Sequence, residues 1–421
     1  MIGIVGAGIT GLVLAHELAK RGLDFIVIEA APQPGGVIRT LCRDGRVLEL
    51  GPQRTRLSPG VRALIRELGL DAEVITAPAD LPLHVYRAGK LRRVPLTPRD
   101  ALTTDLISLP GKLRVLFEPF TDGVRPEESV AAFLTRKFGR EAYETMLGPL
   151  YGGLYGSDPA DMSVGTSLAR TLDDLGIRGS ILAAWLRRAR NGSATAAPAC
   201  SFRRGMRTLT DALYAAYRDR IRLDEPVLAV HAAAQGYALV TEAGDVACRR
   251  LVLTTPADVS AGLLVPIAPH TAARLERLTY NPLAVVHLDA ACPIRGMGFQ
   301  VAFGERLATR GVTFNASLFD RERTYTAYLG GAADPGLVRS SDSRIGGIAA
   351  AEFELATGCP ARPLHVARVR MPAWDRSWIA LDGIRLPTGI HLAANYESRA
   401  GIPGRIARAR QLAAELAGDR G

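Results

Sequence analysis

At 421 residues the chain is too long for one ordinary domain and suits two or three. Hydrophobic residues make up 48% and charged residues 22%, as in globular proteins with a large core, and no uncharged apolar run reaches the roughly 20 residues that span a bilayer. The formal charge of +10, nearly all of it from arginine, reflects either a GC-rich gene or an anionic partner, but the basic clusters are short and lack interleaved aromatics, which argues against nucleic acid.

The start of the chain predicts a strand, a tight turn, a helix and a second strand. The apolar run Ile2–Val5 is the first strand, and apolar residues at helical spacing follow it until Gly22. The run Phe25–Ile28 is the second strand, and its composition predicts that it is buried. A further amphipathic helix is expected over Val61–Leu68, where Gly69 ends it.

The middle of the chain, residues 95–220, is expected to be mainly helical. A basic amphipathic helix over Ser180–Arg190 precedes a loop of small and polar residues at 191–201, and a last helix is expected over Ile402–Leu416. From residue 221 the pattern changes to short β-like runs. The strand candidates are Val227–Val230, Tyr237–Thr241, Leu251–Thr254, Ala284–Leu288, Val312–Ser317, Tyr325–Leu329 and Gly389–Ala393.

The turn after the first strand carries the pattern G-x-G-x-x-G at Gly6–Gly11. Its context supports nucleotide binding, because it follows a strand, opens a helix and is followed by a second strand. The first glycine permits the tight turn, the second lets a pyrophosphate approach the backbone, and the third allows close helix packing. Glu29 ends the second strand, about 20 residues further on, where a carboxylate binds a ribose hydroxyl. The pyrophosphate would lie at the positive end of the helix dipole.

Two further stretches separate FAD from NAD. The sequence over Gly35–Thr40 resembles the G-G-x-x-R-T signature of the amine oxidase superfamily of flavoproteins, and Glu49–Pro52 resembles the E-x-G-P that approaches the flavin ring in many members. The resemblance implies noncovalent FAD, because no Cys or His sits in a family attachment motif. The cofactor residues that it implies are Gly6, Ala7, Gly8, Ile9, Thr10, Gly11, Glu29, Ala30, Gly36, Val37, Arg39, Gly51, Pro52, Gln53, Arg54, Val227, Trp378, Ala400, Gly401 and Ile402.

Longer stretches narrow the resemblance to the protoporphyrinogen oxidase family. These are residues 128–139 (E-S-V-x-x-F-x-x-R-x-x-G), 153–163, 201–213 and 395–406. The resemblance covers nearly the whole chain and implies an α/β fold with a Rossmann-like FAD-binding domain, a mixed-sheet substrate domain and a helical, membrane-facing domain. The implied boundaries are 1–80, 201–260 and 386–421 for the FAD-binding domain, 81–200 for the helical domain and 261–385 for the substrate domain.

The implied activity is the FAD-dependent oxidation of protoporphyrinogen IX to protoporphyrin IX, with O2 as the electron acceptor. No side chain is predicted as an essential base, since hydride transfer depends on orientation and a dry flavin face. Leu83 stands where some members have a propionate-binding arginine, and Arg405 replaces a cysteine of the last motif. The substrate residues that the resemblance implies are Gly153, Tyr155, Met297, Gln300, Phe314 and Tyr328.

Other interpretations of the same residues stay open. The nearest is oxidation of coproporphyrinogen III, whose extra carboxylates suit the arginine excess. Amine oxidases, carotenoid desaturases and the non-redox GDP-dissociation inhibitors share the fold, although the intact glycines argue against the last class. The odd number of cysteines and the lack of a C-x-x-C spacing indicate a reducing compartment without a metal site, and no signal peptide precedes Gly6, so a cytoplasmic protein is expected. A homodimer is a further expectation.

Basic and apolar residues alternate over about residues 80–190, which predicts either an ordinary helical face or a patch on an anionic membrane. A peripheral, salt-sensitive contact is the functional alternative, since each basic residue near such a surface contributes about 1 kcal/mol. The residues concerned are Arg87, Lys90, Leu91, Arg92, Arg93, Val94, Lys112, Leu113, Arg114, Leu116, Phe117, Leu182, Trp185, Leu186, Arg187, Arg188 and Arg190.

Overall fold

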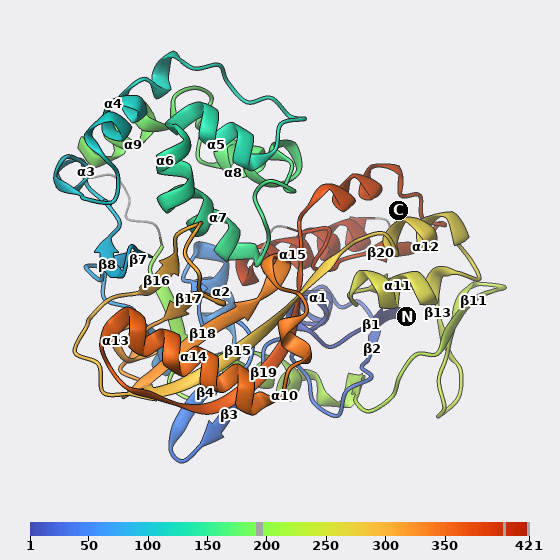
Figure 1. The fold of residues 1–421 in the computed structure, drawn as a ribbon. Coiled ribbons are helices and arrows are strands. Elements are labelled where there is room, and N and C mark those ends of the chain that lie inside the picture. The colour runs from blue at the N-terminus through green and yellow to red at the C-terminus, as the bar shows by residue number, and fades with distance from the viewer. Residues whose placement is uncertain (191–196, 399–400, 419–421) are drawn as a thin grey trace. The chain divides into compact units, whose positions relative to one another are not determined.

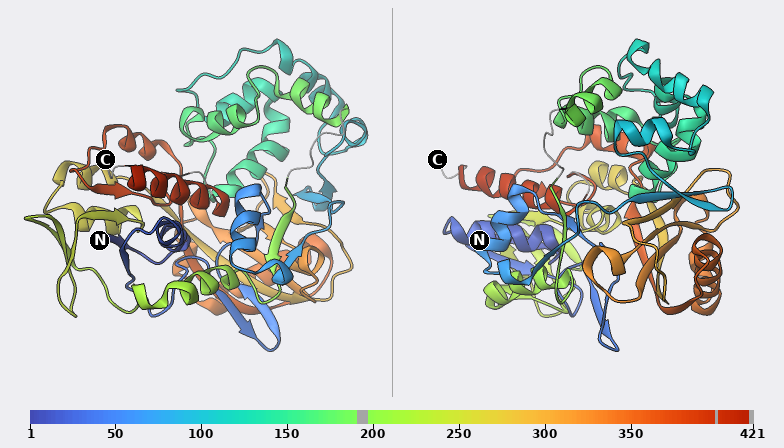
Figure 2. Two further views of the ribbon diagram at one scale, coloured as in Figure 1. Left: turned by 180° about the vertical axis from the view of Figure 1, so that it is seen from behind. Right: turned by 90° about the vertical axis from the view of Figure 1, so that its left-hand side faces the viewer.

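A computed structural model describes residues 1–190, 197–398 and 401–418. The chain forms two compact units, each assembled from separate stretches of sequence (Figures 1 and 2). Unit 1 consists of Met1–Thr76, Ala197–Leu278 and Ser377–Gly421, and unit 2 of Ala77–Ala196 and Thr279–Arg376. Among the described helices, none combines the length and the apolar composition needed to cross a membrane.

Unit 1 is built on a five-stranded, all-parallel sheet. The strand order is β10 (Ile221–Arg222), β2 (Phe25–Ile28), β1 (Ile2–Val5), β14 (Arg250–Leu253) and β20 (Ile390–Leu392). The two predicted N-terminal strands are confirmed residue for residue, because their short apolar runs are buried in the middle of the sheet.

Four helices pack in the apolar core of unit 1. They are α1 (Ile9–Lys20), α2 (Pro59–Glu67), α10 (Arg207–Tyr217) and α15 (Ile402–Gly418), and Figure 1 shows α1 and α15 beside the sheet. Helix α1 is buried from Ile9 to Leu18, so its sequence is apolar almost all round. It ends as predicted, since Gly22 adopts φ 63° and its N–H donates to the Ala19 carbonyl.

The remaining elements of unit 1 are small sheets and short helices. The predicted strand over Val227–Val230 starts too early, because β11 begins at Ala229, after an exposed Leu228. The elements are β3 (Thr40–Arg43), β4 (Arg46–Glu49), β5 (Thr55–Arg56), β6 (Val74–Thr76), β9 (Ala199–Phe202), β11 (Ala229–Ala233), β12 (Gly236–Val240), β13 (Val246–Cys248), α11 (Ala257–Leu264) and α12 (Pro269–Leu275).

Unit 2 contains a seven-stranded mixed sheet. Its order is β19 (Ala361–Pro372), β15 (Tyr280–Ala290), β18 (Thr324–Gly330), β17 (Thr309–Thr313), β16 (Gly298–Val301), β7 (Leu83–Arg87) and β8 (Lys90–Arg93). The β16–β7 pair is parallel, and the other neighbours are antiparallel. Helix α14 (Asp342–Thr357) packs on one face of this sheet.

One predicted strand of unit 2 is wrong at its end. Residues Val312–Ser317 were expected to be extended, but β17 stops at Thr313 and α13 (Asn315–Phe319) follows. Asparagine is poorly suited to a strand interior, and the Asn315 side chain instead donates a 2.8 Å hydrogen bond to Thr326 Oγ1 on β18. β17 therefore ends earlier than the apolar pattern predicts, next to a polar side chain that forms a hydrogen bond to the neighbouring strand.

Residues 98–190 of unit 2 are mainly helical, as predicted. A buried carboxylate organises them: Glu118 accepts hydrogen bonds from the Ile181 and Leu182 N–H groups and pairs with Lys137 Nζ at 2.9 Å. An anion is favourable there because the N–H groups at a helix start lack intrahelical partners. The helices are α3 (Pro98–Thr103), α4 (Leu109–Leu116), α5 (Val130–Phe138), α6 (Arg140–Ala142), α7 (Gly148–Tyr155), α8 (Ala169–Asp174) and α9 (Ile181–Arg190).

Candidate functional site

The turn between β1 and α1 contains three glycines with different structural roles. Gly6 adopts φ 105°, and a Cβ atom there would lie 2.7 Å from Thr254 Oγ1. A Cβ at Gly11 would lie 2.0 Å from the Gly6 carbonyl oxygen, so this position needs glycine for packing alone. Gly8 has an ordinary φ of −70°, and a Cβ there would meet nothing within 4 Å. The space at Gly8, where α1 begins, is the cradle that an added side chain would fill, and it fits a pyrophosphate.

A second glycine segment lies beside the first. The Gly35 N–H donates to the Ala7 carbonyl at 2.8 Å, and Gly8 and Gly35 form a bridge of the parallel type. Gly36 has φ 59°, and a Cβ atom there would lie 3.3 Å from Gly8 Cα. Arg39 Nε donates to the Gly36 carbonyl at 3.1 Å, which places its exposed guanidinium at the same segment. The two predicted glycine motifs are thus brought together.

Glu29 lies directly after β2, at the carboxyl end of the sheet. Its Oε2 accepts a 2.6 Å hydrogen bond from the Ala7 N–H, and its Oε1 accepts a 2.9 Å bond from the Ala31 N–H. These two bonds fix the carboxylate beside the glycine turn. A carboxylate has about four acceptor positions, so lone pairs remain for the hydroxyls of a ribose.

Two residues without a predicted role hold this region in place. Thr254, which follows β14, directs its hydroxyl at the Val5 and Gly6 carbonyls, each at 2.9 Å. Glu49 is 1% exposed and accepts hydrogen bonds from Thr40 Oγ1 at 2.6 Å and from the Met206 N–H at 2.8 Å. Glu49 belongs to the predicted E-x-G-P stretch. The sequence identifies this motif, but it does not predict the hydrogen bonds that the Glu49 carboxylate accepts.

The other predicted cofactor residues of unit 1 lie on its loops. Gln53 is 5% exposed and donates to the Glu49 and Gly51 carbonyls at 2.7 and 3.0 Å, so its amide organises the loop that contains Pro52 and Arg54. Val227 is half-buried between β10 and β11. The residues Ile9 and Thr10 are buried in α1, whereas Ala30 and Val37 are exposed.

The C-terminal loop is held by a tryptophan and an arginine. Trp378 is 2% exposed and donates to the Tyr396 carbonyl at 3.1 Å. Arg405 Nη1 donates to the Ala394 and Ser398 carbonyls at 3.3 and 3.2 Å, so the residue that departs from the family motif ties the loop to α15. The predicted Ile402 is the first residue of α15 and the predicted Gly401 precedes it with φ 83°, while Ala400 lies outside the described residues.

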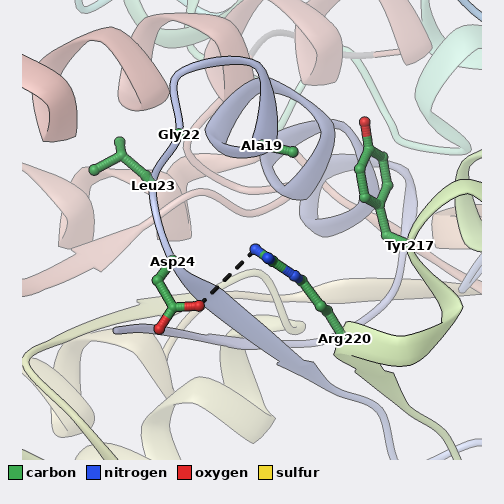
Figure 3. Close-up of a pocket in the computed structure, with 6 residues that line it drawn as sticks. All are labelled: Ala19, Gly22, Leu23, Asp24, Tyr217 and Arg220. Atoms are coloured by element: carbon green, nitrogen blue, oxygen red, sulfur yellow. Dashed lines mark ion pairs between the residues drawn. The ribbon is translucent and has the colours of Figure 1, made fainter.

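A surface pocket of unit 1 lies at the other end of the sheet. Asp24 directly precedes β2 and pairs with Arg220 at 3.9 Å, and Figure 3 shows these two side chains beside Tyr217. Glu29 follows the same strand at its opposite end. Because nucleotides bind at the carboxyl ends of parallel strands, this pocket is separate from the glycine cradle.

The sheet of unit 2 has two chemically different faces. Phe299, Val312 and Ala327 are paired across β16, β17 and β18 and belong to the apolar core with α14. Their sequence neighbours form the next row, in which Gln300 pairs with Gly311 and Gly311 with Tyr328. Since strand side chains alternate between faces, this second row lies on the opposite face. Polar and small residues gather there, including Gly298, Thr313, Thr326 and His287.

The polar face, defined by Gln300, Gly311 and Tyr328, is met by helix α7. A Cβ atom at Gly153 on α7 would lie 2.5 Å from Gln300 Oε1, and one at Gly311 would lie 2.6 Å from the same atom. The Gln300 amide therefore lies between two glycines that make room for it. Three predicted substrate residues, Gly153, Gln300 and Tyr328, are brought to this one face.

The remaining predicted substrate residues have other surroundings. The Tyr155 ring lies 6.5 Å from Trp374, and burial raises the pKa of its hydroxyl, which keeps the group protonated. Met297 is half-buried and its N–H donates to the Pro82 carbonyl at 2.8 Å. Phe314 is fully buried, and its ring packs 5.2 Å from that of Tyr325 in the apolar core, so the structure places it apart from the polar face.

The described residues contain no group of three His, Cys, Asp or Glu side chains suited to a metal ion. The polar face holds instead a buried hydrogen-bonded row, in which Thr326 Oγ1 lies 3.1 Å from His287 Nδ1 and accepts from Asn315. These hydrogen bonds join β15, β18 and the start of α13.

The arrangement in unit 1 is that of a dinucleotide-binding domain: a parallel sheet, a glycine cradle at a helix start and a fixed carboxylate after the second strand. The model of the family described as flavin-containing amine oxidoreductase matches residues 9–379. The chain therefore belongs to the flavin-containing amine oxidoreductase family. It is a flavin-containing oxidoreductase, and membership implies FAD as the cofactor.

Curated relatives are similar over most of the chain. A chloroplastic protoporphyrinogen oxidase from Nicotiana tabacum is 28% identical over 81% of this chain and 69% of its own length. The chloroplastic enzyme of Oryza sativa subsp. japonica is 30% identical over 81% and 72%. A coproporphyrinogen III oxidase from Staphylococcus aureus is 32% identical over 39% of this chain and 38% of its own.

Solved structures share the fold across the full chain. A protein from Exiguobacterium sp. 255-15 assigned as a protoporphyrinogen oxidase has a TM-score of 0.81 at 23% identity and covers 100% of this chain and 99% of its own. Cyclohexylamine oxidase from Brevibacterium oxydans has a TM-score of 0.73 at 17% identity, with 99% and 98% covered. At these identities the likeness establishes the fold, and one fold serves several substrates.

Proposed function

We propose that this protein oxidises protoporphyrinogen IX to protoporphyrin IX, with noncovalently bound FAD and with O2 as the electron acceptor. The observation that carries the proposal is the extent of similarity: relatives named protoporphyrinogen oxidase align with 81% of the chain, including parts of both units. The coproporphyrinogen III oxidase of Staphylococcus aureus aligns with 39% of it.

In unit 1, the glycine cradle and Glu29 would hold the pyrophosphate and a ribose hydroxyl of FAD. The loop Gly51–Arg54 would approach the flavin ring, and Gly401 with Ile402 would bring the start of α15 to the cofactor, where the helix dipole favours negative charge. The flavin supplies a two-electron acceptor when it is bound. The residues of the chain bind and orient it, and the buried Glu49, Thr254 and Trp378 keep their loops in place.

In unit 2, the polar face is the proposed substrate surface. Gly153 and Gly311 leave room for the Gln300 amide, and Gln300 and Tyr328 offer hydrogen-bonding groups to a macrocycle on this face. Met297 could pack on a ring through its polarisable thioether. The reaction needs orientation of a C–H bond and exclusion of water rather than a strong acid, which agrees with the raised pKa of the Tyr155 hydroxyl.

Coproporphyrinogen III is the second candidate substrate. Leu83 stands where some family members bind a propionate with arginine, and the Staphylococcus aureus coproporphyrinogen III oxidase reaches 32% identity within its shorter alignment. Oxygen uptake and porphyrin fluorescence measured with both porphyrinogens would decide between them. A higher kcat/KM for coproporphyrinogen III would replace the proposed substrate, and no turnover of either would refute porphyrinogen oxidation.

A peripheral membrane contact is the second part of the proposal. Exposed apolar side chains concentrate over residues 96–124, where Leu102 is 77%, Leu109 70%, Phe117 61% and Phe120 85% exposed. Part of the segment packs within unit 2, as the alternative of an ordinary helical face predicts: Val94 is buried at 8% exposure, and Leu91, Leu182 and Trp185 are half-buried. These four side chains contribute to packing in unit 2.

Two basic side chains within residues 96–124, Lys112 and Arg114, donate hydrogen bonds to backbone carbonyls of the protein. Lys112 Nζ donates to the Leu102 carbonyl at 2.8 Å, and Arg114 donates to the Lys137 and Arg136 carbonyls. We therefore expect apolar insertion to contribute more than electrostatic attraction, at roughly 25 cal/mol per Å2 buried. Vesicle sedimentation tests this: binding should persist at high salt and fall in a Phe117→Ser/Phe120→Ser variant, and equal recovery of variant and parent would refute it.

A further inference from the structure

Cys292 and Cys359 lie at matching positions on two neighbouring antiparallel strands. The ladder between β15 and β19 ends with Ala290 opposite Ala361. Continuing that register by two residues places Cys292 directly opposite Cys359. Opposite residues of antiparallel strands have Cα atoms about 4.5–5.5 Å apart, within the roughly 4.4–6.8 Å range of disulfides.

The local sequence supports this alignment beyond the last ladder pair. Both cysteines precede a proline, Pro293 and Pro360, and a residue before proline is restricted to extended conformations. Pro360 has no N–H, so the hydrogen-bonded ladder stops while the backbone of Cys359 stays extended. The missing donor is sufficient to end the ladder, so the end of the ladder does not require the two strands to diverge there.

The two cysteines also share one apolar environment. Cys359 belongs to the apolar core of unit 2 and Cys292 packs against that core, and burial, with the neighbouring Cys359 thiol, raises the pKa of Cys292 to about 11. Tyr325 donates a 3.1 Å hydrogen bond to the Cys292 carbonyl, and Cys359 lies in the same apolar core as the Tyr325 ring. The described cysteines are all free, and register places no other pair of them opposite each other.

We propose that Cys292 and Cys359 form a reversible dithiol–disulfide pair that fastens β15 to β19 when peroxide oxidises it. Cys292 is the first target, because it is half-buried whereas Cys359 is buried. Its sulfur attacks hydrogen peroxide, the O–O bond breaks, and a sulfenic acid and one water form. The Cys359 sulfur then displaces the hydroxyl as a second water and forms the S–S bond, so two thiols and one peroxide give one disulfide and two waters.

The raised pKa sets the rate at which the pair responds. Few Cys292 side chains are thiolates at neutral pH, and the thiolate is the nucleophile, so oxidation should be slow and reflect sustained exposure to peroxide. Hydrogen peroxide is the product expected when O2 accepts electrons from a flavin. The pair does not depend on the proposed substrate, however, because the oxidant is added in the test.

The test uses the full-length flavin-loaded protein and hydrogen peroxide, with diamide as a second oxidant. After denaturation and alkylation, mass spectrometry should show that oxidised protein has lost two of its five alkylatable thiols, in a crosslinked peptide pair containing Cys292 and Cys359. Dithiothreitol should restore both thiols. The oxidised protein should also have a higher Tm, because the bond constrains the unfolded chain.

Three variants complete the design. Cys292→Ser and Cys359→Ala should each abolish the crosslink and the rise in Tm, whereas Cys42→Ser, at an exposed position, should leave both unchanged. The proposal is overturned by a sulfinic acid on Cys292 with Cys359 still alkylatable. It is equally overturned if neither oxidant produces the crosslinked pair in the parent protein, where no variant has to fold.

Discussion

The two units place functional groups by opposite means. In unit 1, backbone atoms and one carboxylate form the glycine cradle, and its main residues, Gly6–Gly11 and Glu29, lie close together in the sequence. In unit 2, the polar face takes Gly153 from α7 and Gln300, Gly311 and Tyr328 from three strands. A cradle made of backbone needs glycine at particular positions, whereas a face made of side chains can rearrange. Substitutions should therefore act sharply in unit 1 and gradually in unit 2.

Gly8→Val should have the largest effect, a complete loss of bound flavin from a folded protein. Apart from its own chain neighbours, a Cβ atom at position 8 would meet no atom within 4 Å, so folding should be preserved, but the side chain would occupy the space proposed for the pyrophosphate. Flavin absorbance per protein and circular dichroism measure the two effects. Gly262→Val on α11 is the matched control, because a Cβ there also meets nothing within 4 Å. Stoichiometric FAD in the Gly8 variant would disprove the cradle.

Gly11→Ala should instead destabilise the fold itself. Its Cβ would lie 2.0 Å from the Gly6 carbonyl oxygen, and neither the β1 end nor the start of α1 can move without breaking sheet or helix packing. Overpacking a core costs about 1–3 kcal/mol, and a backbone clash should reach the upper end or exceed it. Chemical denaturation of the flavin-free protein gives the change directly. A Gly11 variant as stable as the Gly262 control would show that the turn relaxes.

These two glycines show what the sequence alone could predict. The G-x-G-x-x-G spacing, the apolar strands and Glu29 are local features of the sequence. The start of the unit 1 fold and its cofactor motif could therefore be predicted from residues that are close together in the chain. Thr254 could not be assigned, because it reaches the Gly6 turn from a strand about 250 residues later and its role depends on sheet order. Arg405 departs from the family motif in sequence, but its hydrogen bonds to the 394–398 loop depend on how that loop folds back on the start of α15.

In unit 2 the sequence was less informative for the same physical reason. Phe314 and Tyr328 look alike as aromatic residues in apolar runs, but strand pairing places one in the core and the other on the polar face. The end of β17 depends on a hydrogen bond between Asn315 and Thr326, which no periodicity reveals. Likewise, Val94 and Phe117 both belong to basic, apolar stretches, and only packing shows that the first is buried and the second exposed.

Acid should destabilise both units by the same mechanism, because each unit contains a buried carboxylate whose pKa is lowered. Burial alone would raise the pKa of Glu17 in unit 1, but hydrogen bonds from Arg21 and Arg410 hold it below the usual value. Glu118 in unit 2 is likewise kept below its usual pKa despite burial, by Ser180 and Lys137. A carboxyl group whose pKa is lower in the folded state than in the unfolded chain stabilises the fold at pH values above its unfolded-state pKa, near 4.5. This stabilisation is lost as the pH falls through the folded-state pKa.

The free energy of unfolding should therefore fall below about pH 4.5, by about 1.4 kcal/mol for each pH unit and each such carboxylate. Glu17→Gln and Glu118→Gln should be less stable at neutral pH, and each should reduce the acid slope. Denaturant unfolding at a series of pH values measures both. An unchanged slope in a variant would show that its carboxylate has the same pKa in the folded and unfolded states.

Gly153→Ala should have the smallest effect and is the counterpart of Gly8→Val. The new Cβ would lie 2.5 Å from Gln300 Oε1, but that atom ends a flexible side chain and can move, unlike the backbone that Gly11 meets. In addition, Gly153 lies near the exposed end of α7, where alanine improves helix propensity by up to about 1 kcal/mol. We expect stability within about 1 kcal/mol of the parent and full flavin content, with a several-fold change in KM for the porphyrinogen, because Gln300 has lost its place between two glycines.

Gly179→Ala, which meets nothing within 4 Å in the same unit, is the control. Loss of flavin in the Gly153 variant would mean that the polar face and the cradle are not separable, and an unchanged KM would remove Gln300 from the proposed substrate surface.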